Sequence, residues 1–205
     1  MTRVNLFGRS DVLPSERVGE PSDEDLMLDA LRGDRSAVAV LVERYHRPLF
    51  AYLYRLVDAN YGAAEDLLQD TFTRLLTPRT YTPGRRVKPW LYAIATNLAR
   101  DRQRALMRRR TDIGLERAEC LADGSDPSDH VVQFERERVV RNAIGSLGDQ
   151  QRAAILLRFY HGLSLAEIAE ALDLPLGTVK SRLSIGTRRL RDLLEAWRRT
   201  SEGSG

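Results

Sequence analysis

Apolar residues recur every three or four positions along most of this chain, and no stretch alternates apolar and polar residues as a half-buried strand would. The period is clearest in residues 37–57, AVAVLVERYHRPLFAYLYRLV, and in residues 87–110, VKPWLYAIATNLARDRQRALMRRR. Pro48 lies inside the first of these helices, where we expect a kink, whereas Pro89 is tolerable in the first turn of the second. The pattern predicts an all-α protein.

Start and stop signals divide this pattern into separate helices. Ser22 can accept a hydrogen bond from a free amide of the first helix, and Gly33 ends that helix. A second helix is expected to start at Ser36, and a third contains residues 63–76, AAEDLLQDTFTRLL. Residues 77–86, TPRTYTPGRR, are rich in turn-forming residues and predict a loop before the long helix.

These helices group into two small domains, which a length of 205 residues can accommodate. The polar residues 1–22 predict a disordered N-terminal tail, and the helices of residues 23–110 predict a first domain. Residues 111–133 are acidic and contain Gly and Pro, which favours a flexible linker. Helical patterns resume at Phe134, so the second domain is expected over residues 134–199.

The second domain contains LSLAEIAEALDLPLGTVKSRL, residues 163–183, in which two amphipathic helices flank a short turn. Ser164 and Glu167 have the spacing of a capping box at the start of the first helix. Pro175 ends that helix, and Thr178 is expected to cap the next one. This arrangement is typical of a helix-turn-helix, whose second helix enters the major groove of DNA.

Only the second helix of this pair is basic. Its first turns place Lys180, Ser181 and Ser184 where base edges would lie, while Arg182 and Arg188 are better placed for phosphates. The alternative is a helical hairpin inside a bundle, with its arginines merely solvated. We favour DNA binding because the exposed face of this helix combines positive charge with short side chains, as a groove requires.

Charge is unevenly distributed, although 32 basic and 29 acidic residues leave a net charge of only +3. Between residues 85 and 110 every charged residue is basic except Asp101. The next segment, residues 111–129, is acidic, and a second basic block lies between residues 180 and 199. Two clusters of cations on either side of an acidic segment favour a nucleic-acid partner.

Several classes of function are disfavoured by what the sequence lacks. The single cysteine, Cys120, excludes an intramolecular disulfide, and three scattered histidines offer no metal-ligand spacing, so we expect neither metal nor cofactor. No apolar run approaches the ~20 residues that cross a bilayer, and a secretory segment is missing, which predicts a cytoplasmic protein with no membrane insertion. No clustered carboxylates, Ser/His/Asp set or phosphate-binding Gly loop indicates an enzyme.

The first domain carries a stripe of acidic and amide side chains. Four residues at helical spacing form it: Glu65, Asp66, Gln69 and Asp70. Such a stripe suits an arginine-rich partner helix, but it also describes an ordinary solvated face.

The long helix of this domain combines cations with aromatic and amide groups, which single-stranded nucleic acid requires for backbone contact and base stacking. Trp90, Tyr92 and Asn97 lie between two basic clusters. Trp90 also follows the core spacing of Leu91 and Ile94, so we predict that Trp90 is buried.

Three motifs, in this order, resemble the sigma factors of bacterial RNA polymerase, in the two-domain group called extracytoplasmic-function (ECF) sigma factors. AEDLLQDTFTRLL is similar to the family's polymerase-binding helix, PWLYAIATNLARDRQR to its promoter-melting helix, and LSLAEIAEALDLPLGTVKSRL to its reader of the upstream promoter element. The resemblance covers residues 23–194. It implies a non-catalytic initiation subunit in which the first domain is sigma region 2 and the second is region 4.

The resemblance also implies partners and three sets of site residues. The partners are promoter DNA, the clamp coiled coil and flap of core RNA polymerase, and an anti-sigma factor. The first set contacts core polymerase: Glu65, Asp66, Gln69, Asp70 and Phe72. The second holds the unwound minus-ten element: Tyr81, Arg85, Arg86, Lys88, Asn97, Asp101 and Arg104. The third reads the minus-thirty-five element: Thr178, Lys180, Ser181, Arg182, Ser184, Ile185 and Arg188.

Three positions depart from the family's usual pattern. The family often has Pro after the Leu of region 4, where this chain has Gly148 after Leu147. Many members have Arg where this chain has Ile185, which removes a DNA donor and favours contact with a thymine methyl group. The turn between the two reading helices often contains Gly at positive φ, where this chain has Asp173.

The rival hypothesis is a free-standing transcriptional regulator that uses the helix-turn-helix alone, with an N-terminal domain that binds a signal or dimerises. The acidic stripe and the basic aromatic helix argue against it, because a ligand-binding or dimerisation domain needs neither.

Overall fold

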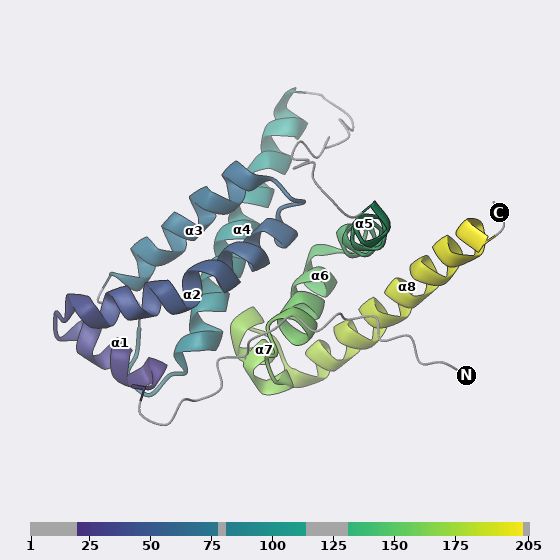
Figure 1. Cartoon of the computed structure of the whole chain (residues 1–205). Coiled ribbons are helices and arrows are strands. Elements are labelled where there is room, and N and C mark those ends of the chain that lie inside the picture. Colours follow the sequence, from purple (N-terminus) through teal and green to yellow (C-terminus); the bar gives the residue numbers. More distant parts are fainter. Residues whose placement is uncertain (1–19, 78–80, 114–130, 203–205) are drawn as a thin grey trace.

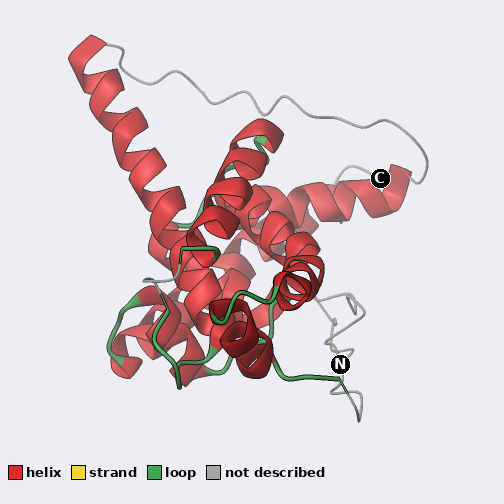
Figure 2. Cartoon of the chain, turned by 90° about the vertical axis from the view of Figure 1, so that its left-hand side faces the viewer, coloured by secondary structure: helices red, strands yellow, loops and turns green. Residues whose placement is uncertain are grey.

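The computed structural model describes residues 20–77, 81–113 and 131–202, and every regular element in these ranges is helical, as predicted (Figures 1 and 2). The predicted tail up to residue 19, most of the predicted linker and Cys120 lie outside the described residues. The elements in chain order are α1 (Asp23–Leu31), α2 (Arg35–Leu56), α3 (Tyr61–Leu75), α4 (Val87–Ile113), α5 (Val131–Gly145), α6 (Asp149–Ile155), the π-helical turn η1 (Leu156–Tyr160), α7 (Leu165–Leu172) and α8 (Leu176–Glu202).

Side chains that precede α1, α2 and α3 accept hydrogen bonds from the free amides of their first turns. Ser22 accepts from the Asp25 amide at 3.1 Å, which confirms the predicted cap of α1. The prediction that α2 starts at Ser36 was wrong, because the carboxylate of Asp34 accepts from the Ser36 amide at 2.8 Å and the helix begins at Arg35. These bonds to Ser36 lower the pKa of Asp34. Asn60 caps α3 in the same way.

Contacts distant in the sequence anchor the long helix α4. The backbone amide of Val87, its first residue, donates to the Glu24 carboxylate of α1 at 3.0 Å. Inside the molecule the Tyr52 hydroxyl of α2 lies 2.7 Å from the Thr96 hydroxyl of α4. Pro48 lies within α2, which continues from Arg35 to Leu56 as one element.

The turn between α7 and α8 was predicted correctly at one end and wrongly at the other. The capping box of Ser164 and Glu167 is present, and Asp173 adopts the left-handed conformation with φ of 52°. Thr178 does not cap α8, which already begins at Leu176, because the Pro175 carbonyl accepts from the Thr178 amide at 2.9 Å. A proline carbonyl can start the helical ladder without a side-chain cap.

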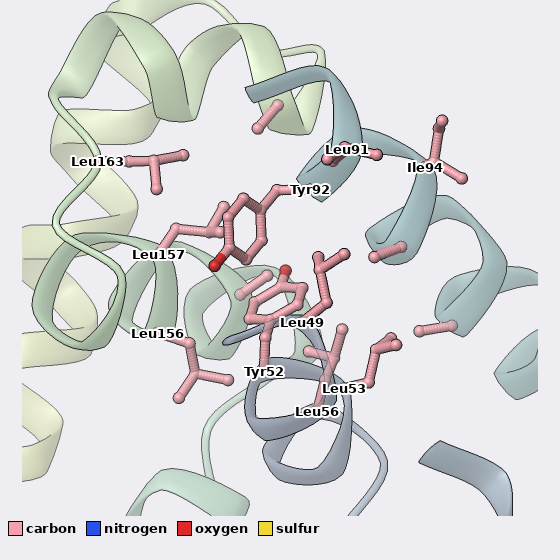
Figure 3. Close-up of a cluster of buried hydrophobic side chains, with 14 of the residues drawn as sticks. Leu49, Tyr52, Leu53, Leu56, Leu91, Tyr92, Ile94, Leu156, Leu157 and Leu163 are labelled. Atoms are coloured by element: carbon pink, nitrogen blue, oxygen red, sulfur yellow. The ribbon is translucent and has the colours of Figure 1, made fainter. Parts of the chain in front are cut away.

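One hydrophobic cluster joins the N-terminal helices α1–α4 to the C-terminal helices α5–α8. Figure 3 shows its centre, where α2, α4 and the segment around η1 meet. The labelled residues are Leu49, Tyr52, Leu53, Leu56, Leu91, Tyr92, Ile94, Leu156, Leu157 and Leu163. Two sequence-distant groups of helices therefore share one buried core.

A glycine permits close packing between α6 and α8. A Cβ placed on Gly186 would lie 3.1 Å from a side-chain carbon of Ile155, which is closer than ordinary carbon contacts. The hydrogen side chain lets α8 lie directly against the residue that ends α6.

Candidate nucleic-acid and partner interfaces

The acidic stripe forms an exposed face of α3. Glu65, Asp66, Gln69 and Asp70 are all exposed, while Leu67, Leu68 and Leu75 of the same helix are buried. Amphipathic spacing is the reason, since residues three and four apart share a face. The Asp66 carboxylate lies 3.6 Å from the Arg102 guanidinium of α4. This face is accessible to a cationic partner.

Aromatic and apolar side chains flank the acidic stripe. Phe72 is half-buried, and its ring stacks with that of His46 at a centroid distance of 6.4 Å. Tyr61 is 57% exposed at the start of α3, and Leu76 is 56% exposed just after its end. A hydrogen bond to Glu65 raises the pKa of Tyr61. The sequence pattern predicted neither Tyr61 nor Leu76 as an interface residue.

The aromatic residues near α4 belong to the core in this structure. Trp90 is buried, as predicted, and the ring of Tyr81 packs edge-on against it with a centroid distance of 5.0 Å. Tyr81 also donates to the Arg85 carbonyl. Tyr92, grouped by the sequence with possible base-contacting residues, is buried as well. In this arrangement no face of these three rings is available for base stacking.

The exposed candidates on α4 are polar. Asn97, Asp101 and Arg104 all face solvent, and Arg104 lies 3.6 Å from the carboxylate of Asp101. Asn97 and Asp101 are four residues apart and Arg104 follows three later, so the three side chains lie along one face of the helix.

The cations that precede α4 contact the first helix of the helix-turn-helix. Arg85 Nε donates to Glu170 Oε1 at 2.8 Å, and an Arg86 nitrogen donates to Glu167 Oε1 at 2.9 Å. Burial alone would raise the pKa of Glu167, but hydrogen bonds from Ser164 and Arg86 outweigh it and leave the pKa lowered. The structure thus joins residues that lie more than 80 positions apart in the sequence.

Lys88 and His161 meet beside these ion pairs. Lys88 Nζ donates to the His161 carbonyl at 2.9 Å, and burial lowers the pKa of Lys88. The His161 Nδ1 atom lies 2.8 Å from the Tyr92 hydroxyl, and its ring packs edge-on against Tyr52. Burial, and then the charges of Arg55 and Lys88, lower the pKa of His161 to about 3. The sequence contains no signal for this contact, since a lone histidine between helices has many possible partners.

The exposed face of α8 carries most of the predicted base-contacting residues. Its buried side consists of Val179, Leu183 and Leu190, with Gly186 between them. Two predicted residues, Thr178 and Arg182, are half-buried. Five predicted residues are exposed: Lys180, Ser181, Ser184, Ile185 and Arg188. In Figure 1, α3 lies at one side of the molecule and α8 at the other, so these two surfaces are separate.

Metal binding and membrane insertion find no support among the described residues. Among them, no group of three or more His, Cys, Asp or Glu side chains is placed to hold a metal ion. In the same residues, no helix combines the length and apolar character that crossing a bilayer requires. A hollow of about 460 Å³ lies between α4 and α6, lined by Arg100, Gln103, Arg104, Met107, Arg108, Asp149 and Gln150.

Both parts of the chain match a known protein family. Residues 41–109 match the family described as Sigma-70 region 2, and residues 137–190 match Sigma-70, region 4. The ECF RNA polymerase sigma factor SigW of Bacillus subtilis is 34% identical over 175 residues, which are 80% of this chain and 91% of that protein. The ECF RNA polymerase sigma-E factor of Haemophilus influenzae is 33% identical over 183 residues, which are 85% of this chain and 94% of that protein.

Two solved structures are similar in fold over most of the chain. The sigma factor RpoE of Bartonella quintana, in complex with the anti-sigma factor NepR, is 26% identical with a TM-score of 0.64, covering 77% of this chain and 96% of RpoE. CnrH, in complex with the cytosolic domain of CnrY, is 25% identical with a TM-score of 0.64, covering 86% of this chain and 99% of CnrH. The chain therefore belongs to the sigma-70 family, and within it to the ECF RNA polymerase sigma factors.

Proposed function

We propose that this ECF sigma factor binds core RNA polymerase through the acidic face of α3, holds melted promoter DNA with the cations around α4, and reads the upstream element with α8. Residues 23–110 and 134–199 then act as the two functional units, joined by the linker of residues 111–133. The protein contributes binding rather than catalysis and works in the cytoplasm, where its polymerase is found.

The observation that carries this proposal is the opposite charge of two exposed helical faces on one chain. The face of α3 presents Glu65, Asp66 and Asp70, whereas the face of α8 presents Lys180 and Arg188. An acidic face repels DNA and favours a basic protein surface, while a basic face with short hydroxyl side chains fits a major groove. A sigma factor needs both kinds of surface, and a free-standing regulator needs only the second.

Reconstitution with core polymerase separates the two hypotheses. We expect the purified chain to co-purify with core polymerase and to support run-off transcription from its promoter. A free-standing regulator would bind duplex DNA without polymerase and would start no transcript.

An anti-sigma factor is the third proposed partner. The likeness to RpoE, whose solved structure contains the anti-sigma factor NepR, supports this. Such a partner would cover the same polymerase-binding and DNA-binding faces, and these faces are accessible on α3 and α8.

Replacing Asp66 or Asp70 by Arg should weaken binding to core polymerase at least tenfold while promoter preference stays unchanged. The substitution places a positive charge opposite a basic partner surface, and such charge reversals cost a few kcal/mol. The measurement is a fluorescence titration of labelled protein with core polymerase. Asp192→Arg, the same charge change on the exposed face of α8, serves as the control. Equal losses in all three variants would exclude a specific role for α3.

Replacing Lys180 or Ser181 by Ala should relax selectivity for the upstream promoter element and leave core affinity intact. Loss of a base contact costs about 1–3 kcal/mol in discrimination, or roughly 5- to 160-fold. This selectivity is measured by competition between wild-type and altered upstream elements for binding to the holoenzyme. A parallel loss of core affinity would contradict the separate roles assigned to α3 and α8.

A further inference from the structure

The hollow of about 460 Å³ between α4 and α6 has a basic lining that the proposed function does not use. Three arginines of α4, Arg100, Arg104 and Arg108, line it together with Asp149 and Gln150 of α6. Its only carboxylate among the described residues is that of Asp149, so the lining carries a net positive charge. Of all its lining residues, only Arg104 belongs to the sets proposed for core polymerase or promoter DNA.

The inner side of this hollow lies beside a pair of guanidinium groups with unsatisfied donors. Arg100 Nη2 and Arg182 Nη1 are both buried and have no hydrogen-bond partner among the described residues. Burial, and then the charge of Arg100, lower the pKa of Arg182, so these two cations lie close together. Unpaired buried donors and neighbouring like charges both cost free energy. An anion that accepts from these donors would lower that cost.

The carboxylate of the lining is already engaged with an uncharged partner. Asp149 accepts a hydrogen bond from Gln103 Nε2 of α4 at 3.1 Å, which links the two walls of the hollow. The arginine donors of α4 are thus not the groups to which this carboxylate is bound through that hydrogen bond. The amide of Gln103 and that of Gln150 are further polar groups on the two walls.

We propose that the hollow binds a small polyphosphate, either inorganic or carried by a nucleotide, through Arg100, Arg104 and Arg108. These arginines are four residues apart, which is about 6 Å along the helix axis from each to the next. A guanidinium group binds phosphate oxygens through two parallel donors, and it keeps its charge at every physiological pH. A linear anion with several phosphate groups can therefore contact all three arginines, whereas a single phosphate cannot.

The size and the second wall of the hollow favour a small ligand over a nucleic-acid strand. Its volume lies within the roughly 300–1,000 Å³ of sites that take small molecules. Asp149 and Gln150 face the arginines from α6, which bounds the hollow on the side opposite α4. If the ligand is a nucleotide, the glutamine amides can bond to a base edge, and Met107 supplies apolar surface for the ring.

Isothermal titration calorimetry with the full-length chain tests this site. The ligands are inorganic phosphate, tripolyphosphate, ATP and GTP, at constant ionic strength and without added divalent metal. We expect tripolyphosphate to bind at least about tenfold more tightly than phosphate, because it reaches more arginines. A higher affinity for ATP or GTP identifies a nucleotide as the ligand, and an equal or lower affinity identifies inorganic polyphosphate. No saturable binding up to about 1 mM, or no preference over phosphate, overturns the proposal.

Variants on both walls locate the bound ligand. Arg100→Gln and Arg108→Gln should each weaken tripolyphosphate binding by about tenfold, since each removes a charged hydrogen-bond donor. Arg109→Gln is the matched control, because Arg109 is an exposed residue of α4 outside the lining, and it should change the affinity by less than about twofold. Equal losses in all three variants would show binding to the general charge of α4 and would overturn the site.

A variant of α6 predicts tighter binding, which misfolding cannot mimic. Asp149→Asn removes the negative charge from the lining but keeps an oxygen that can accept from Gln103. We expect the affinity for tripolyphosphate to rise by about threefold or more. An unchanged affinity would show that the anion does not lie between α4 and α6, and would overturn the proposal even if Arg100→Gln failed to fold.

A DNA measurement distinguishes this inference from the proposed function. Affinity for a labelled single-stranded oligonucleotide should change by less than about twofold in Asp149→Asn and Arg100→Gln, since neither residue belongs to the DNA sets. If both variants altered oligonucleotide and tripolyphosphate binding equally, the hollow would be part of the DNA surface, and the separate site would be overturned. Polyphosphate binding by a chain that starts no transcript with core polymerase would instead overturn only the proposed function.

Discussion

Replacing Arg152 by Met should lower the free energy of unfolding by about 3 to 5 kcal/mol, because the substitution removes the buried donor of three backbone carbonyls, at about 1 to 3 kcal/mol for each acceptor left unpaired. Arg152 is only 4% exposed, and its guanidinium group lies 2.5 Å from the Asp58 carboxylate. It also donates to the backbone carbonyls of Leu56, Gly145 and Leu147, which join α2 to the end of α5. A methionine fills the space but leaves these acceptors unpaired.

Urea unfolding followed by circular dichroism measures this loss. Arg189→Met, at an exposed position of α8, is the matched control and should change stability by less than about 0.5 kcal/mol. Arg152→Lys keeps the charge but replaces the five donors of the planar guanidinium group by three donors on one nitrogen, so we expect an intermediate loss. A loss for Arg152→Met no larger than that of the control would show that the network adds nothing to the stability of the chain.

Lowering the pH from about 7 to about 5 should destabilise the folded chain through His161 by about 2 kcal/mol. Its pKa is about 3 in the folded chain, against an ordinary value of 6.5. The unfolded chain therefore binds the proton first, and stability falls with pH below about 6.5, at up to about 1.4 kcal/mol per pH unit. Above pH 6.5 both states hold neutral histidine, and the effect vanishes.

Urea unfolding at several pH values, with wild type and His161→Gln, isolates this contribution. Glutamine can still form a hydrogen bond with Tyr92 but does not titrate, so the stability difference between the two proteins should shrink as the pH falls. A difference that is constant from pH 7 to pH 5 would contradict burial of neutral His161 between Tyr52 and Tyr92.

Helical periodicity predicted the elements well because it depends on near neighbours. The exposed acidic stripe of α3, the buried Trp90 and the capping box at Ser164 all follow from spacings of three or four residues. The two wrong predictions concerned helix caps, where neighbouring polar groups compete for the same free backbone amides. Asp34 caps α2 rather than Ser36 because its carboxylate reaches the free amides, and Thr178 is not needed as a cap because the Pro175 carbonyl already starts α8.

The sequence alone also indicated the family, because its three motifs occur in a characteristic order and need no knowledge of how the helices pack. The sequence did not indicate that Tyr81 and Tyr92 are buried. An aromatic residue in a loop or at the start of a helix can lie either in the core or on the surface. Burial at such positions depends on which distant helix covers them.

By itself, the sequence determined the helices, the caps of α1 and α7, the charge of each exposed face and the likeness to ECF sigma factors. Only the tertiary structure decided that α7 forms ion pairs with the cations before α4, that His161 packs between two tyrosines, and that Arg152 links α2 to α5. The physical reason is the sequence separation over which each interaction acts. Helix periodicity and capping act over a few residues, whereas these contacts join groups up to 96 positions apart and exist only when separate helices share one hydrophobic core.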